Sequence, residues 1–200
     1  MSTQSNNSRA SVNTAISCPR EFAYLERRQL LALAHDAILS ALEHREITTS
    51  PYPSSFKAPR GVFTTIYLHR QLRGCVGYPL PTTPLYRAIV ETARGAAFED
   101  TRFPPVTLEE GRELEVSLSI LSPLKRVNPE DVEIGIHGLL VSKDGRRGLL
   151  LPQVPLEHGW DRVTFLEQTC KKAGLPPDAW KSAATIEVFT AEIFGDRDVV

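Results

Sequence analysis

The apolar positions of the chain repeat at helical spacing in three separate stretches. In the first, between residues 21 and 46, they face away from charged positions and predict an amphipathic helix laid on a core: Leu30, Leu31, Ala34, Ala37 and Ile38. A second helix begins at Thr83-Pro84, with threonine in the N-cap position and proline in the first turn. Its apolar stripe contains Leu85, Ile89, Ala93 and Ala96. The third helix spans about 161–173, and Gly174 ends it in the left-handed cap position.

Other stretches show the period of a β-strand. Residues 61–68 are rich in β-branched and aromatic side chains, and residues 71–78 follow them as the second arm of a hairpin. Residues 113–121 and 185–194 alternate between apolar and polar side chains. Residues 139–151 predict another hairpin, whose Asp144-Gly145 tip suits a type I′ turn. Hairpins combined with separate helices predict an α+β fold with a mixed, largely antiparallel sheet flanked by helices.

Composition limits the class of protein. Residues 1–20 are mostly polar, so we expect a disordered N-terminal tail followed by one domain over 21–200, and a docking arm is the alternative for the tail. A net charge of -1 offers no basic surface for nucleic acid. No apolar run approaches the roughly 20 residues that span a bilayer, and no export signal is recognisable. We therefore expect a cytoplasmic protein with no nucleic-acid or membrane partner.

Cysteine and histidine positions give no sign of a metal site. The three cysteines, Cys18, Cys75 and Cys170, are widely spaced, and the five histidines lack a ligand-like interval. We expect neither a disulfide framework nor a bound metal or cofactor. Cys170 falls on the apolar face of its helix and is expected in the core.

One strand carries the main candidate site. Its sequence over 72–77 is Leu-Arg-Gly-Cys-Val-Gly, and strict alternation puts Arg73 and Cys75 on the face opposite the apolar residues. A guanidinium on the same face would favour the thiolate of a reactive cysteine. The alternative is that Cys75 is a small packing residue. Gly74 and Gly77 leave room for a backbone or a ligand to approach.

Four further residues are candidates for the same site. Asp100 and Arg102 follow a helix end, where they form either a turn salt bridge or part of a binding surface. His137 lies at the entrance of a strand and is either a base for Cys75 or a histidine bonded to the backbone. Gln153 either directs its amide into a cleft or caps a strand end.

The hexapeptide 72–77 resembles the signature of the AMMECR family, which includes protein A of the AmmeMemoRadiSam system. Further segments agree in order and spacing: 96–100, 102–105, 121–123, 137–139, 145–148, 151–154, 160–161, 165–166 and 170–175. Departures occur at His69-Arg70-Gln71, where the family often has a glycine, at Thr101 in place of proline, and at Leu149-Leu150 in place of Thr-Phe. The resemblance implies a compact two-lobed α+β fold and association with a MEMO-like protein and a radical SAM protein. It implies no particular reaction.

Three functions are compatible with these features. The protein is a component that offers a groove to partner proteins, a module that binds a small anionic ligand through arginines, or an enzyme. In the last case, Cys75 would be the nucleophile or covalent carrier, supported by His137 and Arg73. We favour the binding component, since spacing alone assembles no complete catalytic constellation.

Overall fold

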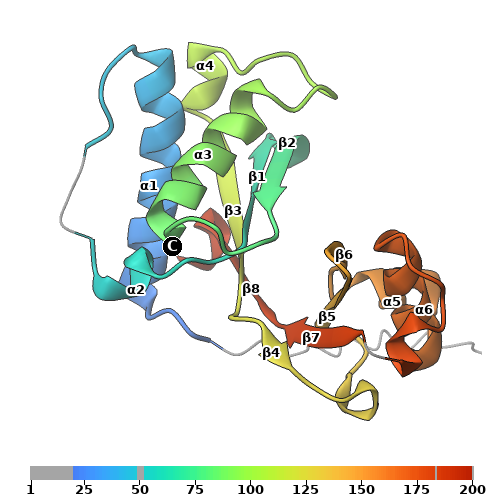
Figure 1. Ribbon diagram of the computed structural model, residues 1–200. Coiled ribbons are helices and arrows are strands. Elements are labelled where there is room, and N and C mark those ends of the chain that lie inside the picture. The colour runs from blue at the N-terminus through green and yellow to red at the C-terminus, as the bar shows by residue number, and fades with distance from the viewer. Residues whose placement is uncertain (1–19, 49–51, 183, 200) are drawn as a thin grey trace, which may run out of the picture.

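The protein has two lobes joined by two short connections (Figure 1). The computed structural model describes residues 20–48, 52–182 and 184–199, so the tail expected over 1–20 lies almost wholly outside the described residues. The first lobe contains the described residues up to Leu121 and those from Ala191 onward, and the second contains those from Lys125 to Phe189. The predicted α+β class and two-lobed form are confirmed, with the strands divided between two antiparallel sheets.

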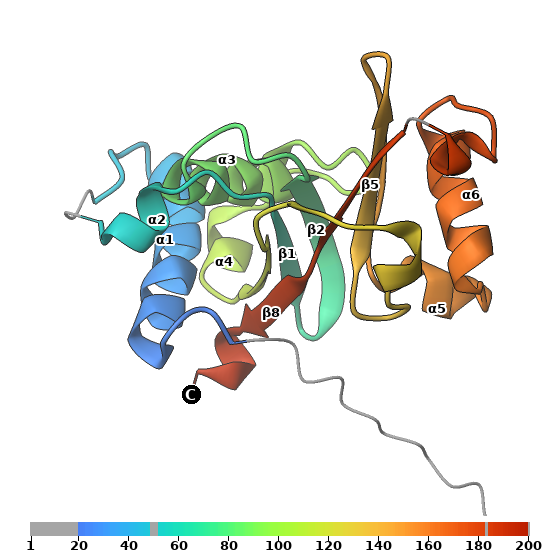
Figure 2. The ribbon, with the colours of Figure 1, turned by 60° about the horizontal axis from the view of Figure 1, so that its bottom comes forward.

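The first lobe is a four-stranded sheet with its helices on one face (Figures 1 and 2). The strand order is β2-β1-β3-β8 and every pairing is antiparallel. The strands are β1 Val62–Leu68, β2 Gln71–Tyr78, β3 Glu115–Leu121 and β8 Ala191–Gly195. The helices are α1 Tyr24–Leu42, α2 Ser54–Lys57, α3 Leu85–Phe98 and α4 Leu108–Gly111.

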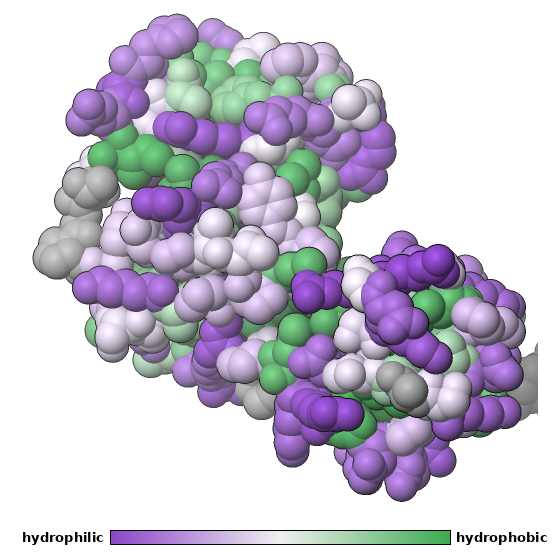
Figure 3. All heavy atoms as spheres, viewed as in Figure 1, coloured by the Kyte–Doolittle hydropathy of each residue, from purple (hydrophilic) through white to green (hydrophobic). Residues whose placement is uncertain are grey.

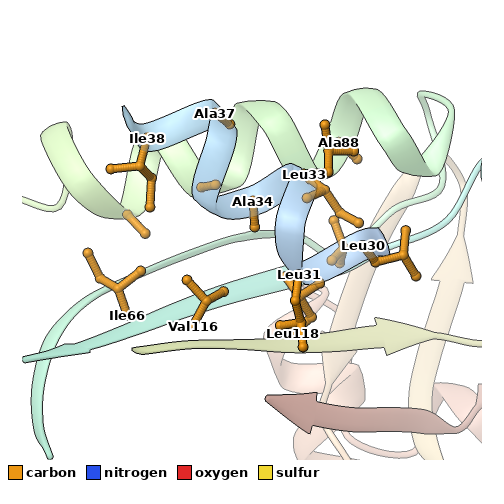
Figure 4. Packing of buried hydrophobic residues seen from close by; sticks show 14 of the residues in the cluster. Leu30, Leu31, Leu33, Ala34, Ala37, Ile38, Ile66, Ala88, Val116 and Leu118 are labelled. Carbon is orange, nitrogen blue, oxygen red and sulfur yellow. The ribbon is translucent and has the colours of Figure 1, made fainter. Parts of the chain in front are cut away.

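The core of this lobe lies between the sheet and the helices α1 and α3. The apolar stripe predicted for α1 is buried, as is the stripe of α3, and both meet the side chains of Ile66, Val116 and Leu118 on the sheet (Figure 4). One polar contact crosses this core, where the hydroxyl groups of Thr64 and Thr92 lie 2.7 Å apart. Burial of these stripes holds the helices on the sheet.

The second lobe repeats the sheet-and-helix arrangement on a smaller scale. Its strand order is β4-β7-β5-β6. The elements are β4 Lys125–Arg126, β5 Gly138–Lys143, β6 Arg146–Leu150, β7 Thr185–Phe189, α5 Val154–His158 and α6 Arg162–Lys172. Single 3-10 turns occur at Pro129–Asp131 and Ala179–Lys181 in this lobe and at Asp196–Asp198 in the first lobe.

The two faces of β5 and β6 have different neighbours. Leu139 and Leu150 are directly paired and pack in the core beneath α6, together with the buried Cys170. Leu140 and Leu149 form the next pair and project from the opposite face of the sheet. Since α5 and α6 lie on the outer side of β5 and β6, this opposite face is directed at the first lobe (Figure 2). The expectation that Cys170 is a core residue is confirmed.

The chain passes between the lobes twice, at residues 122–124 and at Thr190. The Ser122 amide donates to the Thr190 carbonyl at 2.9 Å, and the Thr190 amide donates to Ser122 Oγ at 3.0 Å. The stretch 185–194, expected as one strand, is two: β7 belongs to the second sheet and β8 to the first. The expectation of a single strand was wrong because the chain crosses between the lobes at Thr190, and the burial pattern changes there, with Val188 and Phe189 both buried.

The last strand also holds the beginning of the described chain. Glu192 of β8 is 6% exposed, and its Oε2 accepts from the amides of Glu21 and Phe22 at 2.6 and 3.2 Å. Its Oε1 lies 2.6 Å from Arg27 Nη2 in α1. The two ends of the described chain therefore lie side by side. Among the described residues, no helix is long and apolar enough to cross a membrane.

Two tight turns determine the hairpins. Asp144 and Gly145 have φ angles of 50° and 78°, which confirms the predicted type I′ conformation. The turn between β1 and β2 also has positive φ angles at both central residues, 49° at His69 and 68° at Arg70. Neither residue is glycine, so both side chains occupy a left-handed conformation that L-residues adopt at a cost.

Replacing Arg70 by glycine should relieve this cost. Arg70→Gly is expected to raise the free energy of unfolding by about 1 kcal/mol, because glycine adopts positive φ without a Cβ clash. Urea titration measures the change. Arg112→Gly is the matched control: Arg112 has φ −79°, and the same replacement there should lower stability by about 0.5 kcal/mol. Equal losses in both variants would contradict the account of the turn.

Candidate functional site

The strand that carries the hexapeptide contains a β-bulge. Ile66 pairs with Gly74 and Tyr67 pairs with Leu72, so Arg73 has no partner across the hairpin. One extra residue on a strand reverses the direction of the side chains beyond it. Leu72 is consequently 42% exposed, whereas Arg73 is 9% exposed. The expectation that Arg73 projects from the open face beside Cys75 was wrong for this reason.

The Arg73 guanidinium braces β2 against the segment that leads into α4. Its Nε and Nη2 donate to the two carboxylate oxygens of Glu110 at 3.1 and 3.0 Å, and its Nη1 donates to the Pro104 carbonyl at 2.8 Å. Glu110 also accepts from the Thr107 amide at 2.9 Å, which completes the capping box of α4. The hydrogen bonds from Arg73, followed by that from Thr107, hold the pKa of Glu110 below its usual range.

Cys75 lies on the opposite, partly open face of β2. Its thiol accepts a hydrogen bond from Thr65 Oγ1 at 3.3 Å, and its backbone amide donates to Asp100 Oδ2 at 2.8 Å. Asp100 in turn accepts from Arg102 Nε and Nη2 at 2.9 and 2.6 Å. The Asp100–Arg102 turn salt bridge weighed as one interpretation of the sequence is present, and it is attached to the backbone of the hexapeptide.

The charges at this position are fixed by those hydrogen bonds. The Arg102 guanidinium, and next to it the Cys75 amide, hold the pKa of the Asp100 carboxyl well below its usual range. The Asp100 side chain is 7% exposed, whereas that of Arg102 is 56% exposed. Asp100 therefore stays ionised. Its carboxylate accepts the hydrogen bond of the Cys75 amide, which points outward from the edge strand β2.

The two glycines of the hexapeptide allow two close approaches within the protein. A Cβ at Gly74 would lie 2.0 Å from the Ala96 carbonyl oxygen, so this glycine lets β2 pack directly on α3. A Cβ at Gly77 would lie 2.0 Å from the Phe63 ring, which rests on the glycine backbone. Gly77 and Phe63 are paired residues on the same face as Cys75 and Thr65. The open face of β2 thus continues from the thiol to this aromatic ring.

A groove of about 550 Å³ begins at that ring and separates the two lobes. It is mainly apolar, and hydrophobic surface is visible where the lobes meet in Figure 3. The first lobe supplies Phe63, Gly77, Pro79 and Leu80. The second supplies Leu140, Arg147, Gly148, Leu149, Leu150, Leu151, Val154 and Lys172.

His137 and Gln153 belong to the second lobe and lie apart from Cys75. The ring nitrogen Nδ1 of His137 accepts from the Glu133 amide at 3.1 Å, and the residue lines a separate polar pocket with Lys125, Arg126 and Asp131. Gln153 is exposed in the N-cap position of α5, where its side chain makes no capping hydrogen bond. The expected cleft shared by Arg73, Cys75 and His137 is therefore not formed.

Two groove residues, Arg147 and Lys172, were missed as site candidates. Arg147 follows a hairpin tip, and its pairing with Ser142 puts it on the face of Leu140 and Leu149. Lys172 is the last residue of α6 and lines the same groove. The alternation of residues 147, 149 and 151 was the available signal. Among the described residues, no group of three or more metal-binding side chains is present.

Removing Arg73 should destabilise the first lobe. Arg73→Ala leaves Glu110 and two carbonyl groups without their donor, and we expect the free energy of unfolding to fall by about 2–3 kcal/mol. Arg87→Ala is the control, since Arg87 is exposed on α3, and it should change stability by less than about 0.5 kcal/mol. A loss no larger than that of the control would show that the brace contributes nothing.

The same contribution should depend on pH. Because the folded-state pKa of Glu110 is lowered, its stabilisation is complete above the unfolded-state pKa of about 4.3 and is lost as pH falls through the folded value. The stability difference between the parent protein and Arg73→Ala should therefore shrink in acid.

The two described cysteines should differ sharply in reactivity. Cys75 is partly exposed, whereas Cys170 is fully buried and burial raises the pKa of its thiol. Iodoacetamide should label Cys75 in the folded protein and Cys170 only after unfolding, as followed by peptide mass spectrometry. Protection of Cys75 until the protein unfolds would mean that the open face of β2 is closed in solution.

Comparison with known proteins shows similarity over most of the chain. A protein of Aquifex aeolicus is 41% identical over 184 residues, covering 87% of this chain and 94% of the relative. A protein of Methanopyrus kandleri is 44% identical over 181 residues, covering 84% and 87%. The crystal structure of an uncharacterized protein from Pyrococcus horikoshii is similar with a TM-score of 0.66 and 41% identity, covering 85% of this chain and 91% of that one. A family model described as AMMECR1 matches residues 31–194, and the chain belongs to this family.

Proposed function

We propose that the protein is a binding component whose site is the groove between its lobes, entered from the open face of the hexapeptide strand. The observation that carries the proposal is the groove itself, since both lobes contribute apolar side chains to a space of about 550 Å³. Volumes of this size, with apolar walls and a few polar groups, are typical of binding sites.

The hexapeptide contributes through its second glycine. Phe63 rests on Gly77 and forms one end of the groove, so a side chain at position 77 would displace an aromatic wall. Cys75 lies on the same face two residues earlier, next to Thr65 and Asp100. Its place is beside the bound partner or ligand, with Asp100 and Arg102 holding the strand edge in position.

A nucleophilic role for Cys75 receives less support. His137, the base expected to activate it, is bonded to the Glu133 amide in the other lobe, and Arg73 is engaged with Glu110. The hydrogen-bond partner of the thiol is the Thr65 hydroxyl, which is no base at neutral pH. Binding accounts for the geometry without requiring a reaction.

The family resemblance gives the partners to test. It associates such a protein with a MEMO-like protein and a radical SAM protein, and we propose that one of them occupies the groove. Both lobes line the groove, so a partner bound there contacts both of them. Its binding would then depend on how the two lobes are positioned relative to each other.

Binding of each purified partner can be measured by isothermal titration calorimetry with groove variants. Leu80→Arg places a charged side chain in the groove at a residue outside the core clusters, and it should weaken binding about tenfold or more. Leu156→Arg alters an exposed apolar residue of α5 outside the groove and should bind normally. Equal affinity of the two variants would remove the groove as the site, and no binding of either partner would refute the proposed association.

A further inference from the structure

We propose that the groove receives an extended, acidic and apolar peptide segment of a partner protein, which lies beside the free edge of β2. This inference rests on the proposed function and specifies the chemistry of the occupant. Its three supports are the charge of one wall, the apolar surface between the walls and the backbone groups at the end of the groove.

The charge of the groove is uncompensated. Arg147 and Lys172 both line it and both are exposed, and neither forms a salt bridge with another described residue. None of the described residues that line the groove is aspartate or glutamate. Two cations lining one apolar groove favour a carboxylate-bearing occupant and disfavour a basic one.

The apolar surface has the spacing of a sheet. Leu149 of β6 and Leu151, just after the strand, belong to one apolar cluster, and Leu140 is the cross-strand partner of Leu149. An extended peptide presents every second side chain to one wall, so apolar residues two positions apart can lie on these leucines. An acidic residue at the next position of the same set then faces Arg147, which projects from the same side of β6 as Leu149.

The free backbone groups belong to Gly77. Strand β2 is at the edge of its sheet, and the Cys75 amide points outward to Asp100. Because outward and inward backbone groups alternate along an antiparallel strand, the N–H and C=O of Gly77 point outward as well. They lie at the end of the groove and can pair with one residue of an extended peptide.

The same geometry limits the length of that pairing. Asp100 already occupies the outward amide of Cys75, and Pro79 has no amide hydrogen. The peptide therefore pairs at Gly77 and is then directed across the groove toward β6. A free anion of phosphate size would use the cations and leave the leucine surface and the Gly77 edge unused.

Fluorescence polarisation tests the inference with a labelled eight-residue peptide that has glutamate at positions 1 and 7, valine at positions 3 and 5, and serine elsewhere. The protein should bind it about tenfold more tightly than the matching peptide with lysine in place of glutamate, and added salt should weaken binding. Arg147→Glu should weaken binding about tenfold, whereas Lys171→Glu, which makes the same charge change outside the groove, should have a much smaller effect. Circular dichroism melting confirms that each variant is folded.

A second arm tests the backbone pairing. A peptide N-methylated at alternate residues should bind more weakly than its unmethylated form, because the bond to Gly77 is lost. Equal binding of acidic and basic peptides would overturn the proposal, as would full displacement by millimolar inorganic phosphate, which would indicate a small-anion site. If Leu80→Arg abolishes partner binding while no acidic peptide binds, the groove remains the partner site and only the peptide chemistry is wrong.

Discussion

The two-lobed arrangement depends on the hydrogen bonds between Ser122 and Thr190, which join the two connections between the lobes. At this point the chain crosses from β3 to β4 and returns from β7 to β8, so both connections between the lobes pass through one pair of residues. Leu121, Phe189 and Ala191 are buried around the crossing and join a cluster that includes Phe63 and Leu149. These last two residues also line the groove, one from each lobe, so the cluster at the crossing continues into the walls of the site.

Local sequence patterns predicted those elements whose side chains report directly on burial. The stripe of α3 and the Asp144-Gly145 turn were foreseen because helical spacing and turn chemistry are local properties. The division at Thr190 was not foreseen, because strand-forming residues lie on both sides of it and no glycine or proline marks the change of sheet. The bulge at Arg73 was hidden for a related reason: one unpaired residue leaves no mark in the sequence but reverses which side chains face outward.

In the candidate site, too, contacts between near neighbours in the sequence could be predicted, whereas contacts between distant segments could not. The Asp100–Arg102 contact spans two residues and could be anticipated, whereas the bond from Asp100 to the Cys75 amide joins segments 25 residues apart. Arg147 resembled an ordinary turn residue until its pairing with Ser142 fixed the face from which it projects. His137 has the expected chemistry for a base, but the division into two sheets separates it from the thiol.

Glu192 has a consequence for how the chain is made. It belongs to β8, which follows the whole second lobe in the sequence, yet it binds the amides of Glu21 and Phe22 and the side chain of Arg27 at the start of the first lobe. As the nascent chain leaves the ribosome, α1 emerges long before the carboxylate that anchors it. The edge of β3 that pairs with β8 likewise stays unpaired until β8 has been synthesised. The first lobe is therefore the first to begin leaving the ribosome and the last to have all its strands available, with the second lobe synthesised in between.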